Sequence, residues 1–172
     1  MTALQIASMK KFMAQLLTSD AFDDFLLEEA TIKTGCTYEI DGHINKEFYN
    51  DGTSTVSGQE NTGIPAYDCS LWSEQKTLAF NLIKGRRTPL FFRFVLQYKP
   101  EKVAALLSAA NCDVDPAQVK SLILNIRYDG SKAVITTGSS FTTFLLTREP
   151  DAIWDKAVCR LLESRDIEYE QL

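Results

Sequence analysis

The sequence contains only one histidine, and its four cysteines lie far apart among its 172 residues. The cysteines do not form the closely spaced pair that is typical of zinc sites and redox motifs, and one histidine does not complete a metal site around them. They are Cys36, Cys69, Cys112 and Cys159. We therefore expect four reduced thiols in the core, no metal and no cofactor.

Long apolar runs and a net positive charge are also absent. No run approaches the ~18 apolar residues that span a bilayer, and the amino terminus lacks the apolar core of a signal peptide. The formal charge of −5 argues against a protein that coats nucleic acid or an anionic membrane through its overall charge. These absences indicate a cytoplasmic protein without a membrane partner, and they leave its oligomeric state open.

The composition is that of a folded domain. Apolar residues make up 45% of the chain and charged residues 24%, which is the ordinary range for a globular protein of this length. We expect a single domain over residues 1–172. A stretch rich in glycine, serine, threonine and asparagine, residues 50–66, predicts a mobile loop within it.

Hydrophobic periodicity predicts the elements of this domain. Apolar residues alternate with polar ones, as is typical of half-buried strands, over residues 2–6, 29–40, 90–98 and 122–128. They recur at helical spacing over residues 9–17, 71–83, 103–110 and 153–162. The chain therefore combines strands and helices in alternation.

The first hairpin is predicted at Asp41-Gly42, directly after the strand over 29–40. A two-residue turn would set apolar side chains opposite polar ones. A three-residue loop instead pairs Ile40 with Ile44 and keeps the apolar residues of both strands on one face, because side chains alternate with a period of two. We therefore expect the odd-length loop, with Cys36 on the inward face.

The second hairpin is predicted at Asp129-Gly130, where a two-residue turn matches Ile126 with Ala133. Strand, helix, hairpin and helix then occur twice in this order, over residues 1–85 and 89–165. The sequence thus predicts an α+β fold of two β-α-β-β-α halves. Such units form an antiparallel or mixed sheet with its helices on one face.

Two resemblances bear on this prediction. The order of elements resembles the fold of the DNA sliding clamps and the saddle of the TATA-binding protein, and either resemblance implies a basic face against the DNA backbone. Four segments carry a resemblance at the level of residues: FDDFLLEEATI (22–32), IDGHI (40–44), LIKGRRTP (82–89) and LNIRYDG (124–130). They resemble an uncharacterised family of short single-domain proteins from anaerobic Gram-positive bacteria, known as a domain of unknown function. That resemblance implies no activity, cofactor or site.

Positive charge is concentrated in one part of this acidic chain. Residues 76–102 contain seven cations and one carboxylate. Within them, KGRRTP (84–89) closes a helix, whereas a phosphate loop opens one, so phosphoryl transfer is not indicated. The predicted basic strip consists of Lys84, Arg86, Arg87 and Arg93, which would bind an acidic protein or a nucleic-acid backbone. The alternative is that these cations only complement a helix carboxyl terminus and decorate a solvated face.

The sequence therefore predicts a binding or interaction module without catalytic residues. The alternative is a small enzyme acting on an anionic metabolite, with His43 as general base, Arg86 or Arg87 as anchor and residues 50–66 as lid. That alternative requires all three features to converge on one pocket.

Two further groups of charged residues have structural interpretations. Arg93 and Arg127 are expected on one face of the sheet, where they pair with Glu39 or Glu47 or bind an acidic ligand. An acidic group lacks the spacing and the glycine of a calcium loop, and we interpret it as a solvated turn. Its members are Asp20, Asp23, Asp24, Glu28 and Glu29.

Overall fold

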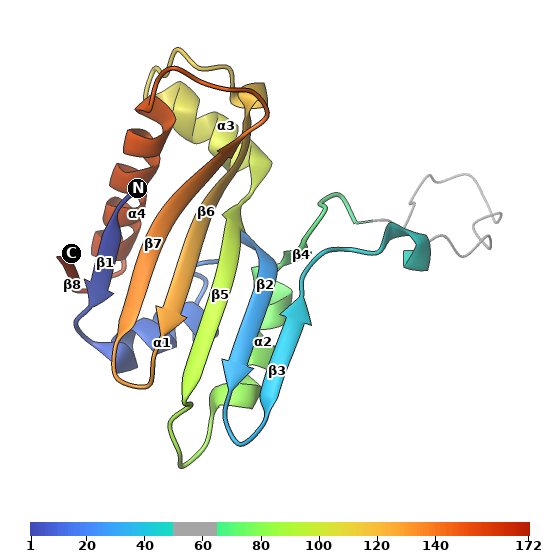
Figure 1. Ribbon diagram of the computed structural model, residues 1–172, viewed down its shortest axis with the longest axis vertical. Helices are drawn as coiled ribbons and strands as arrows, with labels where there is room; N and C mark the ends of the chain where they lie inside the picture. The colour runs from blue at the N-terminus through green and yellow to red at the C-terminus, as the bar shows by residue number, and fades with distance from the viewer. Residues whose placement is uncertain (50–64) are drawn as a thin grey trace.

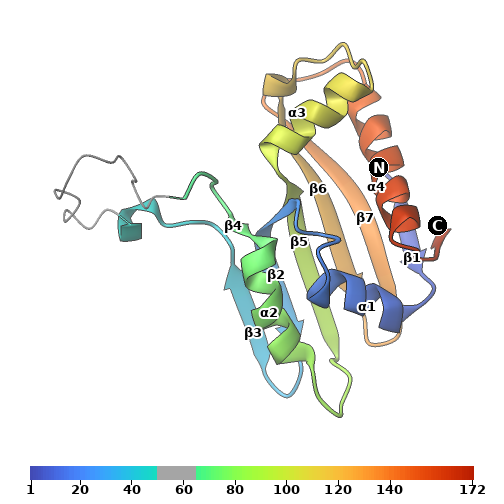
Figure 2. The ribbon, with the colours of Figure 1, turned by 180° about the vertical axis from the view of Figure 1, so that it is seen from behind.

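The computed structural model of the protein describes residues 1–49 and 65–172. These residues form one antiparallel sheet of eight strands, and four α-helices lie together on one face of it (Figure 1, Figure 2). The strands are β1 (Ala3–Ile6), β2 (Phe25–Lys33), β3 (Thr37–Asp41), β4 (Ser70–Leu71), β5 (Phe91–Tyr98), β6 (Val119–Tyr128), β7 (Ala133–Phe141) and β8 (Tyr169–Gln171). The helices are α1 (Met9–Thr18), α2 (Trp72–Ile83), α3 (Pro100–Ala109) and α4 (Glu149–Ser164), with short 3-10 helices η1 (Lys46–Tyr49) and η2 (Pro116–Gln118). The α+β fold predicted from the sequence is confirmed.

The strands lie in the order β3-β2-β5-β6-β7-β1-β8, and β4 pairs with β2 beyond the end of β3. Along the chain, β1-α1-β2-β3-β4-α2 is followed by β5-α3-β6-β7-α4, so the two halves differ by the short strand β4 and the internal repeat stays a prediction. In the sheet, however, β5 lies centrally between β2 and β6, whereas β1 lies near the far edge beside β7. The chain between β1 and β2 therefore crosses the helical face of the sheet, where α1 lies (Figure 2).

The two faces of the sheet have different environments. Side chains such as Phe94, Leu124 and Ile135 point toward the helices and are fully buried. Their neighbours along the strands, among them Arg93 and Arg127, point to the other face, which no helix of the described residues covers (Figure 1). Antiparallel sheets commonly have one packed and one solvated face, and the alternation in the sequence reflects this. We call the uncovered side the open face.

The helices begin and end near the predicted residues. Helix α1 follows Ser8, α3 begins at Pro100, and α2 ends at Ile83, shortly before Gly85. Proline is favoured in the first turn of a helix because the amide that it lacks has no partner there. None of the helices in the described residues is both long and apolar enough to cross a membrane.

The first hairpin turns earlier than predicted, so this part of the prediction was wrong. The chain reverses at residues 34–36, and Ala30 pairs with Ile40. Because an odd-length turn leaves the apolar positions of both strands on the same face, the alternation continues unbroken through the turn. In the sequence the hairpin therefore has the pattern of one long strand.

Gly42, which was predicted to turn the hairpin, packs against β2 instead. Its amide donates to the Glu28 carbonyl at 2.8 Å. The register between β2 and β5 shifts at this point, between Leu27 and Glu29. A Cβ atom on residue 42 would lie 1.8 Å from the Leu27 carbonyl oxygen. Glycine is required because it alone permits so close an approach of two backbones.

The second hairpin turns at residues 129–132, and its predicted register was wrong by two residues. Tyr128 pairs with Ala133, which was expected opposite Ile126. The Asp129 carboxylate accepts hydrogen bonds from two amides of the turn, both at 3.0 Å, and so stabilises this longer connection. A shift of two residues leaves every side chain on its own face, so the predicted core is unchanged.

The strand β8 at the carboxyl terminus was not predicted. It pairs with β1, where Gln5 lies opposite Glu170. Its three residues, Tyr169–Gln171, are too few to show a period in the sequence. Only the neighbouring edge of β1 defines it as a strand.

We predict that Gly42→Ala lowers the free energy of unfolding by about 2 kcal/mol or more, because the added methyl group forces two backbones apart. Gly35→Ala is the matched control, since a Cβ on residue 35 meets no atom within 4 Å. The control should change the free energy of unfolding by less than about 0.5 kcal/mol. Urea denaturation followed by circular dichroism measures both, and equal stability of the two variants would contradict this account of Gly42.

Candidate functional site

Three of the four residues of the predicted basic strip lie in one connection. Lys84, Arg86 and Arg87 follow the end of α2 and precede β5, and all three are exposed. Lys84 has extended geometry, with a ψ of 141°, while its amide still donates to the Phe80 carbonyl at 2.8 Å. Pro89 follows and does not allow the helix to continue. The connection therefore leaves the helix and places the three cations together.

This connection borders a groove on the helical side of the sheet, with α1 on the other side of it. The groove has a volume of about 560 Å³. Its floor includes the stacked pair of Phe92 and Tyr128, whose ring centroids are 5.0 Å apart. Its walls are largely apolar and include Met9, Met13, Leu17, Phe80 and Ile83. Exposed cations stand at its rim: Lys10 from α1 and Lys84, Arg86 and Arg87 from the connection. We call this feature the cationic groove.

The cations at the rim have no acidic partner in the described part of the chain. None of Lys10, Lys84, Arg86 and Arg87 takes part in an ion pair there. Lys84 Nζ lies 5.7 Å from the centre of the Phe80 ring, which at an exposed site is a weak cation–π contact. The charge at the rim is therefore available to a ligand.

Arg93, the fourth residue of the predicted strip, does not join the groove. It follows Phe92 in β5, so its side chain points to the open face while Phe92 lines the groove. Its Nη1 lies 2.7 Å from Glu29 Oε1, and its Nε donates to Asn125 Oδ1 at 3.3 Å. The sheet thus separates Arg93 from the other three residues. As expected, Arg93 shares a face with Arg127, directly opposite it, but its acidic partner is Glu29 and not the residues named from the sequence.

The acidic group between α1 and the first half of β2 pairs with cations and is more than a solvated turn. Three ion pairs join it to three helices: Asp20 to Arg165 after α4 (2.9 Å), Asp23 to Lys76 of α2 (2.5 Å) and Asp24 to Lys102 of α3 (3.2 Å). We call residues 19–24 the acidic connection. Part of the positive charge of residues 76–102 is therefore neutralised inside the protein. Among the described residues, no three histidine, cysteine, aspartate or glutamate side chains gather into a candidate metal site.

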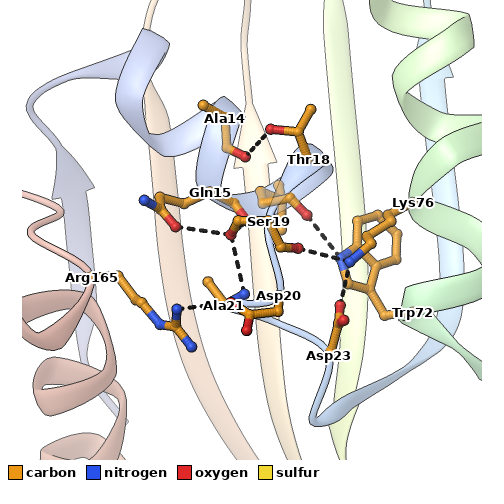
Figure 3. Close-up of polar contacts among 11 residues, drawn as sticks. Ala14, Gln15, Thr18, Ser19, Asp20, Ala21, Asp23, Trp72, Lys76 and Arg165 are labelled. Atoms are coloured by element: carbon orange, nitrogen blue, oxygen red, sulfur yellow. Dashed lines mark hydrogen bonds and ion pairs between the residues drawn. The ribbon is translucent and has the colours of Figure 1, made fainter.

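Lys76 is the least exposed of these cations, with 16% of its side chain accessible. Its Nζ donates to the Ser19 carbonyl at 2.7 Å as well as to Asp23 (Figure 3). Trp72 Nε1 donates to the Leu16 carbonyl at 3.0 Å. Carbonyls in the last turn of a helix have no partner within that helix, so α2 supplies donors for the end of α1. These bonds hold together the two helices that wall the cationic groove.

His43 lies beside the first half of β2, away from the connection that borders the cationic groove. Its Nδ1 is 2.6 Å from Asp41 Oδ1, and its amide donates to the same oxygen at 3.0 Å. The hydrogen bond from this amide is the main cause that lowers the pKa of Asp41 below its usual value, and the hydrogen bond with the ring is the second. At the end of the connection with the arginines, the Leu90 amide donates to the Lys33 carbonyl of β2. The Gly42 amide donates to the Glu28 carbonyl of the same strand. Along a strand this interval is roughly 16 Å.

The convergence that the enzyme alternative requires does not occur among the described residues. His43 does not line the cationic groove that Arg86 and Arg87 border. The lid predicted over residues 50–66 lies, except for residues 65 and 66, outside the described residues. The geometry therefore groups the arginines with α1 and not with the histidine.

The four cysteines are free thiols in different environments. Cys69 is buried, as expected, but Cys36 is exposed in the turn of the first hairpin, so its predicted inward position was wrong. Cys112 and Cys159 are half-buried. Burial, and to a smaller extent the charge of nearby carboxylates with Glu28 foremost, raises the pKa of the Cys69 thiol to about 11.

Sequence reasoning missed the α1 side of the cationic groove. Met9 and Met13 were assigned only to the apolar stripe of a helix, and Lys10 was given no role. A weak signal was present, because methionine is common at adaptable binding surfaces. Periodicity does not show which other element an apolar stripe faces, so the contact between α1 and the arginines emerges only in the fold.

The fold and the groove define the class of protein: an α+β domain with one antiparallel sheet, helices on one face and a cationic groove between two of its helices. The chain belongs to a family of unknown function, DUF5721, whose model matches residues 15–170. The predicted resemblance to an uncharacterised family is thus confirmed. No curated protein and no solved structure matches the chain. The resemblance to sliding clamps stays a prediction from the order of elements.

We predict that Lys76→Met lowers the free energy of unfolding by about 1–3 kcal/mol, because it leaves the Ser19 carbonyl and the partly buried Asp23 without their donor. Lys46→Met is the matched control, since Lys46 forms an exposed ion pair with Asp68. An exposed pair contributes about 0–1 kcal/mol, so this control should be near wild type. Thermal and urea denaturation measure the difference, and equal losses in both variants would refute the role assigned to Lys76.

We predict that iodoacetamide at pH 8 modifies Cys36 well before Cys69. The thiolate is the reactive form, and a pKa of about 11 keeps the buried Cys69 thiol protonated at that pH. Mass spectrometry of digested samples measures the time course. Cys36→Ser should remove the fastest modification, whereas urea should make Cys69 reactive. Equally fast modification of both cysteines in the folded protein would contradict the structure.

Proposed function

We propose that this protein is a non-catalytic binding module and that its cationic groove binds an acidic segment of a protein partner. The segment carries carboxylates for the cations at the rim and apolar side chains for the walls. The observation that supports this proposal is the combination, in one groove, of apolar walls with four cations that have no acidic partner among the described residues.

The size and chemistry of the groove suit a docked peptide. Its volume of about 560 Å³ lies within the range of about 300–1,000 Å³ that is typical of ligand sites. Burial of apolar side chains against Met9, Met13 and the exposed ring of Phe80 would supply affinity, and the methionines adapt to partners of different shape. Arg86 and Arg87 can each bind a carboxylate through two hydrogen bonds, which would orient the segment.

A protein segment suits the groove better than a nucleic-acid backbone, the other ligand suggested by the sequence. Phe92 and Tyr128 are only 1% and 7% exposed, so bases have no ring face on which to stack. Binding of a phosphate backbone favours a continuous row of cations. Arg93, which would extend the row, lies on the opposite face and pairs with Glu29. The net charge of −5 also opposes a polyanion.

Selection of peptides from a random library displayed on phage tests the proposal. Peptides that bind the wild-type protein should be enriched in aspartate and glutamate next to leucine or phenylalanine. Arg86→Glu combined with Arg87→Glu should weaken their binding by about tenfold or more, because attractive charge pairs become repulsive. Fluorescence anisotropy with labelled peptides measures the dissociation constants.

Lys156→Glu combined with Arg160→Glu is the matched control, because it makes the same change of charge at exposed positions of α4. Screening by salt should limit its effect on binding to less than about twofold. Equal losses in both double variants would show that only the overall charge of the protein matters. Enrichment of basic or uncharged peptides, or of none, would also contradict the proposal.

A further inference from the structure

A second hollow lies on the open face of the sheet, over β6, β7 and the turn between them. Its volume is about 350 Å³. Its lining residues all have polar side chains except for one valine, and they are Asn125, Arg127, Asp129, Lys132, Val134 and Thr136. The cationic groove shares none of these residues and lies on the helical side of the sheet. We call this second feature the open-face hollow, and its role does not depend on that of the groove.

Arg127 is positioned by an aromatic ring and not by a carboxylate. Its guanidinium carbon lies 5.7 Å from the centre of the Phe91 ring, which Lys33 also approaches at 5.3 Å. Within residues 1–49 and 65–172, Arg127 forms no ion pair. A guanidinium that lies over a ring keeps the N–H donors at its edge available. Arg127 therefore brings both charge and unused donors to the hollow.

Asn125 is oriented by a chain of polar contacts on the same face. Its Oδ1 accepts a hydrogen bond from Arg93 Nε at 3.3 Å, and Arg93 is held by Glu29 at 2.7 Å. Because the oxygen of the amide is engaged, its NH₂ group is left as a donor. Asn125 pairs across the strands with Thr136, which lines the same hollow. An amide donor and a hydroxyl thus lie side by side next to Arg127.

The turn between β6 and β7 adds Lys132. Asp129 Oδ1 accepts hydrogen bonds from the Ser131 hydroxyl at 2.8 Å and from the Lys132 amide at 3.0 Å. These bonds, that of the Lys132 amide foremost, lower the pKa of Asp129 to about 2, so its carboxylate is charged. Lys132 itself takes part in no ion pair of the described chain. The hollow is therefore lined by two cations and one carboxylate. This small excess of positive charge suits a ligand with a single anionic group and not a polyanion.

We propose that the open-face hollow binds the oxyanion group, a phosphate or a carboxylate, of a small polar molecule. Arg127 and Lys132 supply the charge, and the Asn125 amide and the Thr136 hydroxyl supply neutral hydrogen bonds. Cations that only keep a protein surface hydrated do not need neighbouring side chains to hold them in one orientation. Here the ring of Phe91 and the contact from Arg93 hold donors in place around one hollow, as expected of a binding site.

Separate titrations with inorganic phosphate and with acetate test this proposal. Two-dimensional ¹H–¹⁵N NMR of the whole chain should show saturable shifts at residues 125–136 with at least one of the two anions. Arg127→Gln should weaken that binding by about tenfold or more, because it removes the charge and the paired donors. Saturation by phosphate alone identifies a phosphoryl ligand, and saturation by acetate alone identifies a carboxylate.

Lys120→Gln is the matched control, because Lys120 is an exposed cation on the same strand that does not line the hollow. It should leave the affinity unchanged. Thr136→Val removes only the hydroxyl, and it should weaken binding several-fold even if Arg127→Gln does not fold. The proposal is overturned if neither anion gives saturable shifts, or if Lys120→Gln weakens binding as much as the two variants of the hollow.

Discussion

The ion pairs of the acidic connection link three helices of the protein to one segment, and the pair with Lys76 is the one that stabilises the helical layer. Its three aspartates reach cations on or beside three different helices, while Phe22 between them is fully buried. Exposed ion pairs contribute little to stability one by one. Lys76 contributes more because it is largely buried and also satisfies a carbonyl at the end of α1. The position of α1 against α2, and with it the shape of the cationic groove, depends on these contacts.

The same pairing explains the uneven distribution of charge along the sequence. Basic residues concentrate in 76–102, which contain one carboxylate, and the fold brings several of them against acidic residues from the first part of the chain. Lys76, Arg93 and Lys102 are neutralised in this way. Lys84, Arg86 and Arg87 are not, within the described residues, and they remain at the rim of an apolar groove. A basic segment in sequence thus contains both structural and available cations.

Much of the fold was predictable from the sequence, whereas the candidate site was predictable only in part. The helices, the strands and the two faces of the sheet follow from hydrophobic periods of 3.6 and 2 residues. The turns were misplaced because a different strand register can keep every side chain on the same face of the sheet. The hydrophobic pattern is then unchanged, so it does not locate the turns at residues 34–36 and 129–132. Three of the four predicted basic residues gather in one place, but the contribution of Met9 and Met13 has only a weak signal in the sequence.

The sequence by itself determined the class of fold, the end of α2 before Gly85 and the side of the sheet on which Arg93 lies, because each depends on residues close together in the chain. The tertiary structure decided the order of the strands, the place of α1 beside Arg86 and Arg87, and which cations stay unpaired. Those features depend on contacts between residues far apart in the sequence. Several arrangements share the same local pattern, and charge, burial and the close approach of backbones, as at Gly42, select one of them.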